Sequence, residues 1–151
     1  MRRLAVFSLL MTLFAGSCAS SVTVEGDAGR VVLDDHPKRI VSLSATHTEI
    51  LYAIEAGNLI VATDLTSNYP AQAETTTKVD AFNFNLEEIA ATEPDLVITA
   101  FDFQGEVSGL EAVGISVLLL TPASNLTDAY EQIRILGDVT GRDSEAAELV
   151  S

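Results

Sequence analysis

The chain has 151 residues, of which 48% are apolar and 20% are charged, a composition typical of a globular protein rather than a disordered or fibrous one. Its 22 acidic and 8 basic residues give a formal charge of −14, so the chain lacks the basic side chains that build a nucleic-acid-binding face. Attachment through anionic lipid headgroups is disfavoured for the same reason. The single Cys excludes an internal disulfide, and the length suits one domain or one lobe of a larger protein.

The amino terminus is typical of an export signal. A short basic start precedes an uncharged apolar run over residues 4–15, which is shorter than the roughly 20 residues of a membrane span. Small residues then lead to Cys18, and this pattern predicts a lipoprotein signal peptide over residues 1–17 with the lipid on Cys18. The alternative is an ordinary signal peptide cut near Ala19, with Cys18 discarded. Loss of residues 1–17 removes two basic and no acidic residues, which leaves a formal charge of −16.

The exported part begins with a predicted β-hairpin and continues with alternating strands and helices. Residues 18–30 are expected to form the anchored linker and the start of that hairpin, whose strands flank the turn-forming Glu25–Gly29. Four nearly continuous apolar runs predict strands buried on both faces, as in a parallel sheet: Arg39–Leu43, Leu59–Thr63, Asp95–Thr99 and Ser116–Leu120. Helical patterns lie between and after them: Thr46–Ala56, Leu86–Thr92, Val107–Val113, Leu126–Val139 and a helix that begins at Asp143.

Capping residues set the expected helix boundaries. Thr46 and Glu49 have the spacing of a capping box, and Gly57 is the expected stop of the first helix. Asn85 and Asn125 are the predicted N-caps of the second and fourth helices. Alternating strands and helices predict an α/β fold with a doubly wound, mostly parallel sheet and helices on both faces. Because the chain stops inside a helical pattern, we infer that it is the amino-terminal portion of something longer.

Motifs of catalysis are absent from the sequence. There is no phosphate-binding glycine loop and no GxSxG nucleophile motif, and His36 and His47 lack metal-ligand spacing. We therefore expect neither an enzyme nor a resident metal or cofactor. The remaining candidate site is formed by the loops at the carboxyl ends of the parallel strands, where open α/β sheets bind ligands. These loops carry aromatic and polar side chains, which suit a small molecule.

Several segments resemble the periplasmic binding proteins for cobalamin and iron-siderophore import. The segments are Pro37–Ser44 leading into Thr48–Leu51, Asn68–Ala73, Asn85–Ile89, Glu93–Ile98, Gly114–Val117 and Tyr130–Gly137. The resemblance implies two α/β lobes joined by one long helix, with the ligand between the lobes. Residues 31–141 would form the amino-terminal lobe and residues 142–151 the start of the interlobe helix, with the second lobe absent.

The resemblance and the edge loops together nominate the site residues. The candidate ligand-binding residues are Ser44, Thr46, His47, Thr66, Tyr69, Phe82, Phe84 and Phe101. For the residues at the helix start the alternative is simple capping, and for each aromatic the alternative is packing in the core. In the resembled family, a Glu at the place of Glu87 projects from the lobe and pairs with Arg on the permease; the alternative is a solvated carboxylate.

The expected function is that of an exported solute-binding component of an ATP-driven importer, lipid-anchored at the outer face of the cell membrane or in the periplasm. Its partners would be a small ligand, the importer permease and, through the anchor, the membrane. Only Lys78 is expected near the cleft as a cation, so a neutral corrinoid or a hydroxamate siderophore is favoured over an anionic catecholate. The alternatives are a zinc- or manganese-binding transport lipoprotein and a tethered sensor or scavenger without a transporter.

Overall fold

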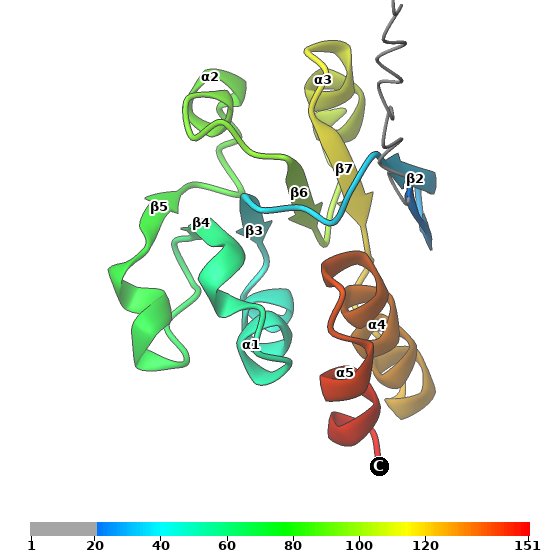
Figure 1. Cartoon of the computed structure of the whole chain (residues 1–151). Coiled ribbons are helices and arrows are strands. Elements are labelled where there is room, and N and C mark those ends of the chain that lie inside the picture. Colours follow the sequence, from blue (N-terminus) through cyan, green and yellow to red (C-terminus); the bar gives the residue numbers. More distant parts are fainter. Residues whose placement is uncertain (1–20) are drawn as a thin grey trace, which may run out of the picture.

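The computed structural model describes residues 21–151, so the predicted signal peptide and Cys18 lie outside the described residues. This part of the chain forms a two-stranded hairpin, a five-stranded sheet and a set of helices (Figure 1). The strands are β1 (Val22–Gly26), β2 (Gly29–Leu33), β3 (Ile40–Leu43), β4 (Ile60–Asp64), β5 (Thr77–Val79), β6 (Leu96–Thr99) and β7 (Ser116–Leu119). The α-helices are α1 (Ala45–Ala53), α2 (Leu86–Ala90), α3 (Glu106–Ala112), α4 (Leu126–Thr140) and α5 (Asp143–Leu149), and the short 3₁₀ helices are η1 (Gly57–Leu59) and η2 (Ala71–Thr75).

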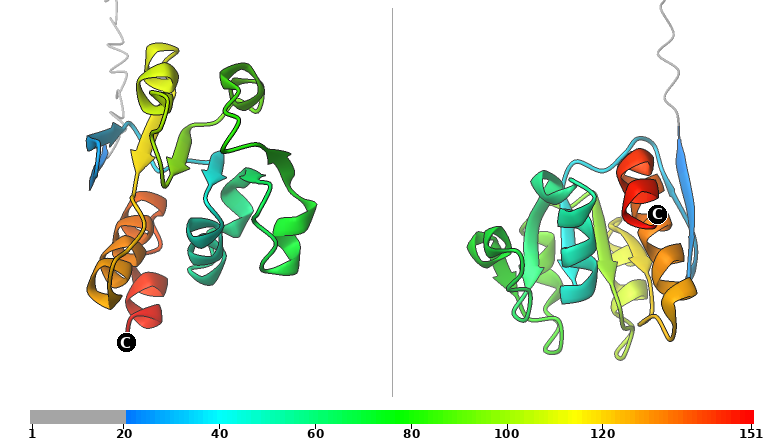
Figure 2. Two further views of the ribbon diagram at one scale, coloured as in Figure 1. Left: turned by 180° about the vertical axis from the view of Figure 1, so that it is seen from behind. Right: turned by 90° about the horizontal axis from the view of Figure 1, so that it is seen from below.

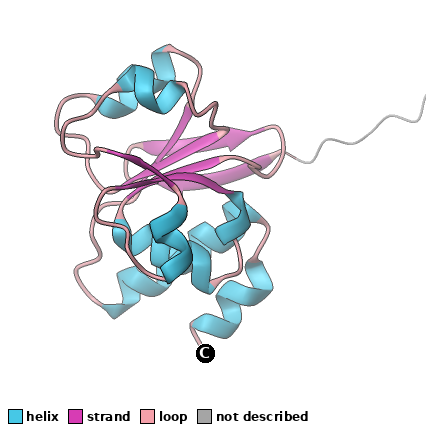
Figure 3. Ribbon diagram, turned by 90° about the vertical axis from the view of Figure 1, so that its left-hand side faces the viewer, coloured by secondary structure: helices cyan, strands magenta, loops and turns pink. Residues whose placement is uncertain are grey.

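The five-stranded sheet is parallel and has the order β5-β4-β3-β6-β7. Its central strands β3 and β6 are buried along their whole length, because helices cover both faces of the sheet (Figure 3). Successive side chains of a strand face opposite ways. Ile40 therefore joins the core cluster beneath α1, α4 and α5, whereas Val41 joins the cluster beneath α2 and α3. This arrangement confirms the predicted doubly wound parallel sheet.

The edge strand β5 was missed by the sequence prediction. It has three residues, of which Thr77 is exposed, Lys78 is half-buried and Val79 is buried. A strand this short, with one apolar residue, lacks the continuous apolar run that identified the four predicted parallel strands. It forms because β4 offers a free parallel edge on which Ala62 pairs with Thr77.

The predicted boundaries of α1 were wrong at both ends. The N-cap is Ser44, with no capping bond from its side chain, so Thr46 and Glu49 do not form the expected capping box. At the carboxyl end, the backbone turns out of the helix at Glu55, which adopts a left-handed φ of 59° in place of the expected Gly57. The bond from the Ala56 N–H to the Leu51 carbonyl closes this turn.

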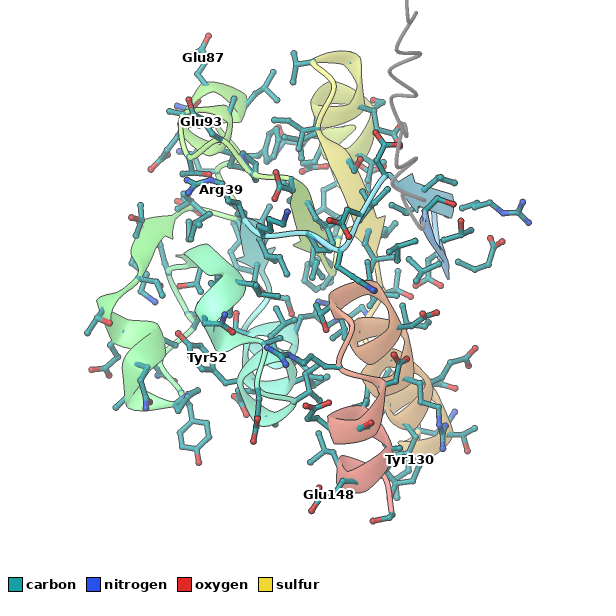
Figure 4. The ribbon with its side chains drawn as sticks, in the orientation of Figure 1. Arg39, Tyr52, Glu87, Glu93, Tyr130 and Glu148 are labelled. Atoms are coloured by element: carbon teal, nitrogen blue, oxygen red, sulfur yellow. The ribbon has the colours of Figure 1, made fainter. Side chains whose placement is uncertain are left out.

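The predicted caps of α2 and α4 are confirmed. Asn85 Oδ1 accepts hydrogen bonds from the N–H groups of Glu87 and Glu88, and Asn125 Oδ1 accepts one from the Asp128 N–H. Arg39 holds the turn that follows α2: its guanidinium donates to the carbonyls of Thr92 and of Glu93, the latter at 2.7 Å (Figure 4). A cation is favourable at a helix carboxyl end because it complements the helix dipole.

The predicted hairpin is confirmed and packs beside the end of β7. Val22 and Val24 of β1 are buried in the core cluster that includes α4. At the hairpin turn, the Asp27 N–H donates to the Leu119 carbonyl at 2.8 Å, and its carboxylate accepts from the Thr121 N–H at 2.6 Å. At the other end of the chain, α5 begins where the interlobe helix was expected. Its continuation into a second lobe stays a prediction.

Candidate ligand-binding edge

The loops that follow the parallel strands gather at one edge of the sheet, the lower edge in the right-hand view of Figure 2. β3 lies between β4 and β6, and the chain leaves β3 toward α1 on one face but leaves β6 toward α3 on the other. Such a divergence opens the crevice in which open α/β sheets bind ligands. The candidate site, hereafter the carboxyl edge, consists of residues 44–48, 65–69, 80–85, 100–105 and 120–125.

Phenylalanine side chains cluster on the carboxyl edge. The ring centroids of Phe82 and Phe101 are 6.4 Å apart, and Phe101 stacks on Phe103 at 4.9 Å with an interplanar angle of 14°. Phe82 and Phe103 are 64% and 66% exposed, and Phe101 is 36% exposed. Large apolar rings left in water form a surface that can receive the flat apolar face of a ligand. We call these three residues the phenylalanine cluster.

Sequence reasoning placed two of these rings at the site but missed Phe103. Phe103 is separated from Phe101 by one residue in the loop after β6, and this spacing on a loop beyond a buried strand is the signal that could have identified it. Phe84 has a different position. It is half-buried and packs against the core cluster beneath α2 and α3, so the structure favours the core-packing alternative for this residue.

The loop after β4 presents two predicted residues to solvent. Tyr69 is 65% exposed and Thr66 is also exposed. The N–H and hydroxyl of Thr66 both donate to the carboxylate of Asp64, which is itself buried at the end of β4. The loop is therefore anchored at its beginning by a buried charge, and the ring of Tyr69 is free to contact a ligand.

The first turn of α1 brings Ser44 and Thr46 to the edge but not His47. Ser44 is half-buried and Thr46 is exposed, and the free N–H groups of a helix amino terminus are available to a ligand oxygen. His47 is 1% exposed and lies beside Gln132 of α4. Burial lowers the pKa of His47 to about 4, against an opposing influence of the Gln132 amide, so the ring is neutral at pH 7. The structure thus places His47 beneath the edge rather than on it.

The basic residue expected near the cleft has structural partners instead. Lys78 donates from Nζ to Thr63 Oγ1 at 2.8 Å, to the Ser67 carbonyl at 2.5 Å and to the Ala73 carbonyl at 2.8 Å. An ammonium group has three protons, and these three acceptors use all of them. Lys78 is therefore not available to an anionic ligand in this conformation.

Glu87 lies apart from the carboxyl-edge aromatics, on the first turn of α2. Its side chain is exposed and points away from the lobe (Figure 4). Its N–H is bonded to Asn85, but its carboxylate has no hydrogen bond or ion pair within residues 21–151. A carboxylate without an intramolecular partner is free to pair with a partner protein.

Residues 21–151 contain neither a helix suited to a bilayer nor a cluster of metal ligands. None of the helices in this range is both long enough and apolar enough to span a bilayer. The same residues contain no group of three or more His, Cys, Asp or Glu side chains placed to hold a metal ion.

Comparison with known proteins identifies the family. Residues 40–151 match the periplasmic binding protein family. The chain belongs to this family. It is 30% identical over 134 residues to an uncharacterised ABC transporter substrate-binding lipoprotein of Bacillus subtilis, an alignment that covers 85% of this chain and 43% of that protein. A vitamin B12-binding protein of Vibrio campbellii is 38% identical over 87 residues, which cover 56% of this chain and 32% of the relative. The chain thus spans less than half the length of these two relatives.

Solved structures of binding proteins share the fold. An ABC-type Fe³⁺-hydroxamate transport system protein from Saccharomonospora viridis superposes with a TM-score of 0.72 at 27% identity, covering 85% of this chain and 51% of that one. A possible iron-binding, periplasmic solute-binding protein from Staphylococcus epidermidis gives a TM-score of 0.71 at 29% identity, covering 77% and 47%. These comparisons confirm the resemblance inferred from the sequence.

Proposed function

We propose that this binding-protein chain is the amino-terminal lobe of the substrate-binding component of an ATP-driven importer, and that it captures a corrinoid or an iron siderophore. Residues 31–141 would form the lobe, and residues 142–151 would begin the helix that leads to a second lobe. Relatives named for vitamin B12 binding and for Fe³⁺-hydroxamate transport support this ligand class. The component would bind and release its ligand without chemical conversion.

The phenylalanine cluster is the observation that carries the proposal. Three exposed rings, from the loops that follow β5 and β6, give one apolar wall of a site. A corrin ring or the apolar backbone of a hydroxamate siderophore can lie against such a wall and bury it from water. The wall also distinguishes this function from the alternative of zinc or manganese transport, which needs converging His and carboxylate ligands instead.

Polar groups around the wall would orient the ligand. Tyr69 and Thr66 would approach it from the loop after β4, and the α1 amino terminus at Ser44 and Thr46 would offer N–H groups to a ligand oxygen. Lys78 is occupied by three oxygen atoms of its own lobe, so cations for an anionic ligand would have to come from elsewhere. A neutral corrinoid or hydroxamate therefore fits this lobe better than a ferric catecholate.

Delivery of the ligand to the permease would depend on two features outside the ligand site. Glu87 would pair with a basic residue of the permease and orient docking, since a rim charge steers association more than it adds affinity. Cys18 would carry a lipid that holds the protein outside the cell at the membrane. The match to a substrate-binding lipoprotein of Bacillus subtilis supports this location.

Equilibrium dialysis with coloured ligands tests the proposal. Cyanocobalamin and a ferric hydroxamate absorb visible light, so retention by the protein measures binding directly. Phe101→Ala should weaken retention about threefold to tenfold, the effect of losing one stacked aromatic ring. Tyr130→Ala removes an exposed ring on α4 and should have no effect. Equal retention by the parent and Phe101→Ala would contradict the proposed site, and tight retention of zinc or manganese in place of both ligands would support the metal-transport alternative.

A further inference from the structure

The loop between β4 and η2 is held in place by one buried residue at its centre. Ser67 is 1% exposed, whereas the residues on both sides of it are exposed: Leu65, Thr66, Asn68 and Tyr69. One inward-facing side chain therefore lies between two pairs of outward-facing ones. Because the loop has no regular secondary structure, its shape depends on what holds Ser67.

The hydroxyl of Ser67 joins the end of β4 to α1. Its Oγ is within hydrogen-bonding distance of the Asp64 carboxylate and 2.9 Å from Thr48 Oγ1. A hydroxyl has one proton, and we assign it to the carboxylate because a charged acceptor makes the stronger bond. Thr48, which is fully buried on α1, can then donate to Ser67 or to Ser42 Oγ, also at 2.9 Å. The loop is thus bonded to the helix that begins the carboxyl edge.

The carbonyl of Ser67 joins the same loop to β5. It accepts a hydrogen bond of 2.5 Å from Lys78 Nζ, which also bonds to Thr63 on β4 and to Ala73 in η2. Side chain and backbone of a single residue therefore bind groups from α1, β4 and β5 at once. Every one of these groups is buried or half-buried.

We propose that Ser67 is the positioning residue of the carboxyl edge, which fixes residues 65–69 in the shape that presents Thr66 and Tyr69 to the ligand. A loop held in its binding shape loses less conformational entropy when a ligand arrives, so affinity depends on Ser67 although its buried side chain does not reach the ligand. The role in affinity rests on the proposed function. The fixing of the loop does not, because the bonds that hold it are internal to the lobe.

Hydrogen exchange on the parent chain and on matched variants tests the positioning role. Ser67→Ala removes only the hydroxyl, and the N–H groups of Thr66 and Ser67, which are hydrogen-bonded to Asp64, should exchange about tenfold faster, as expected for the loss of one charge-assisted bond. Ser67→Thr keeps a hydroxyl and should restore slow exchange. Thr140→Val removes another buried hydroxyl, bonded to the Leu136 carbonyl at 2.6 Å on α4, and should leave these amides unchanged. If Ser67→Ala does not fold, Thr48→Val, which removes only the α1 partner, should still speed exchange in the same amides.

A fluorescent reporter and a ligand separate the two parts of the inference. The chain has no Trp, so Tyr69→Trp introduces a single probe into the loop. In the chain that carries the probe, Ser67→Ala should lower the fluorescence anisotropy of Trp at position 69. In the chain without the probe, Ser67→Ala should weaken retention of cyanocobalamin about tenfold. Thr140→Val should change neither quantity. Unchanged exchange and unchanged anisotropy in Ser67→Ala would overturn the positioning role. If Ser67→Ala speeds exchange but the parent binds neither cyanocobalamin nor a ferric hydroxamate, the result would contradict the proposed function and leave the positioning role in place.

Discussion

Mild acid should destabilise the lobe through His47 on α1. The side chain is 1% exposed, and burial lowers its pKa from 6.5 to about 4. Between these pH values the unfolded chain binds a proton that the folded protein excludes, so the free energy of unfolding falls as the pH falls through this window. At about 1.36 kcal/mol per pKa unit, the full loss is roughly 3 kcal/mol, and about 2 kcal/mol of it is lost by pH 5.

Urea unfolding followed by circular dichroism at pH 7.5 and pH 5 measures this loss. His47→Leu replaces the titrating ring with an apolar side chain of similar size, so it should lose about 2 kcal/mol less than the parent between the two pH values. His36→Gln is the matched control, because that ring is exposed and bonds to the Val139 carbonyl at the end of α4. Between pH 7.5 and pH 5, the free energy of unfolding of His36→Gln should still fall by the amount that His47 causes in the parent. An equal loss in the parent and in His47→Leu would refute the reasoning.

Three further predictions concern the cap, the anchor and the docking residue. Asn85→Ala removes the acceptor for two N–H groups of α2 and should lower the free energy of unfolding by about 1 kcal/mol in urea, whereas no loss would show that α2 does not depend on its cap. Metabolic labelling with a palmitate analogue should tag the parent but not Cys18→Ser, and equal labelling of both would contradict the lipid anchor. In the complete two-lobed protein, Glu87→Arg should leave unfolding and ligand affinity nearly unchanged but reduce uptake in cells that carry the permease, whereas Glu88→Arg, at its exposed neighbour on the same turn, should transport normally. Normal uptake by Glu87→Arg would make Glu87 an ordinary surface charge.

The central sheet was predictable because its physical signal is strong. β3 and β6 are buried on both faces, so nearly every position must be apolar, and this requirement is visible in single sequences. The Asn caps of α2 and α4 were predictable because the bond depends on residues within one turn. The edge strand β5 was not, because its pairing depends on a neighbour outside the segment.

The site was harder to predict because exposure is a tertiary property. Phe82 and Phe84 lie on the same loop, yet one is 64% exposed and the other packs against the core. Nothing in their local sequence distinguishes them, since the difference depends on which ring the folded loop turns toward the core. His47 is a second example. Its position on α1 was predicted from the sequence, but its burial depends on the packing of the distant α4 against α1. The Ser67 network was equally hidden, because its partners come from three separate elements.

Amide chemical-shift mapping on the isotope-labelled chain tests most directly whether the carboxyl edge binds the ligand. One lobe supplies only part of the wall that normally buries a small ligand, so we expect cyanocobalamin or a ferric hydroxamate to bind more weakly than micromolar. The account predicts that the shifts concentrate at Thr66, Tyr69, Phe82, Phe101 and Phe103, and that inorganic phosphate as a control ligand leaves these residues unchanged. Shifts confined to the opposite edge of the sheet, or no shifts at saturating ligand, would contradict it.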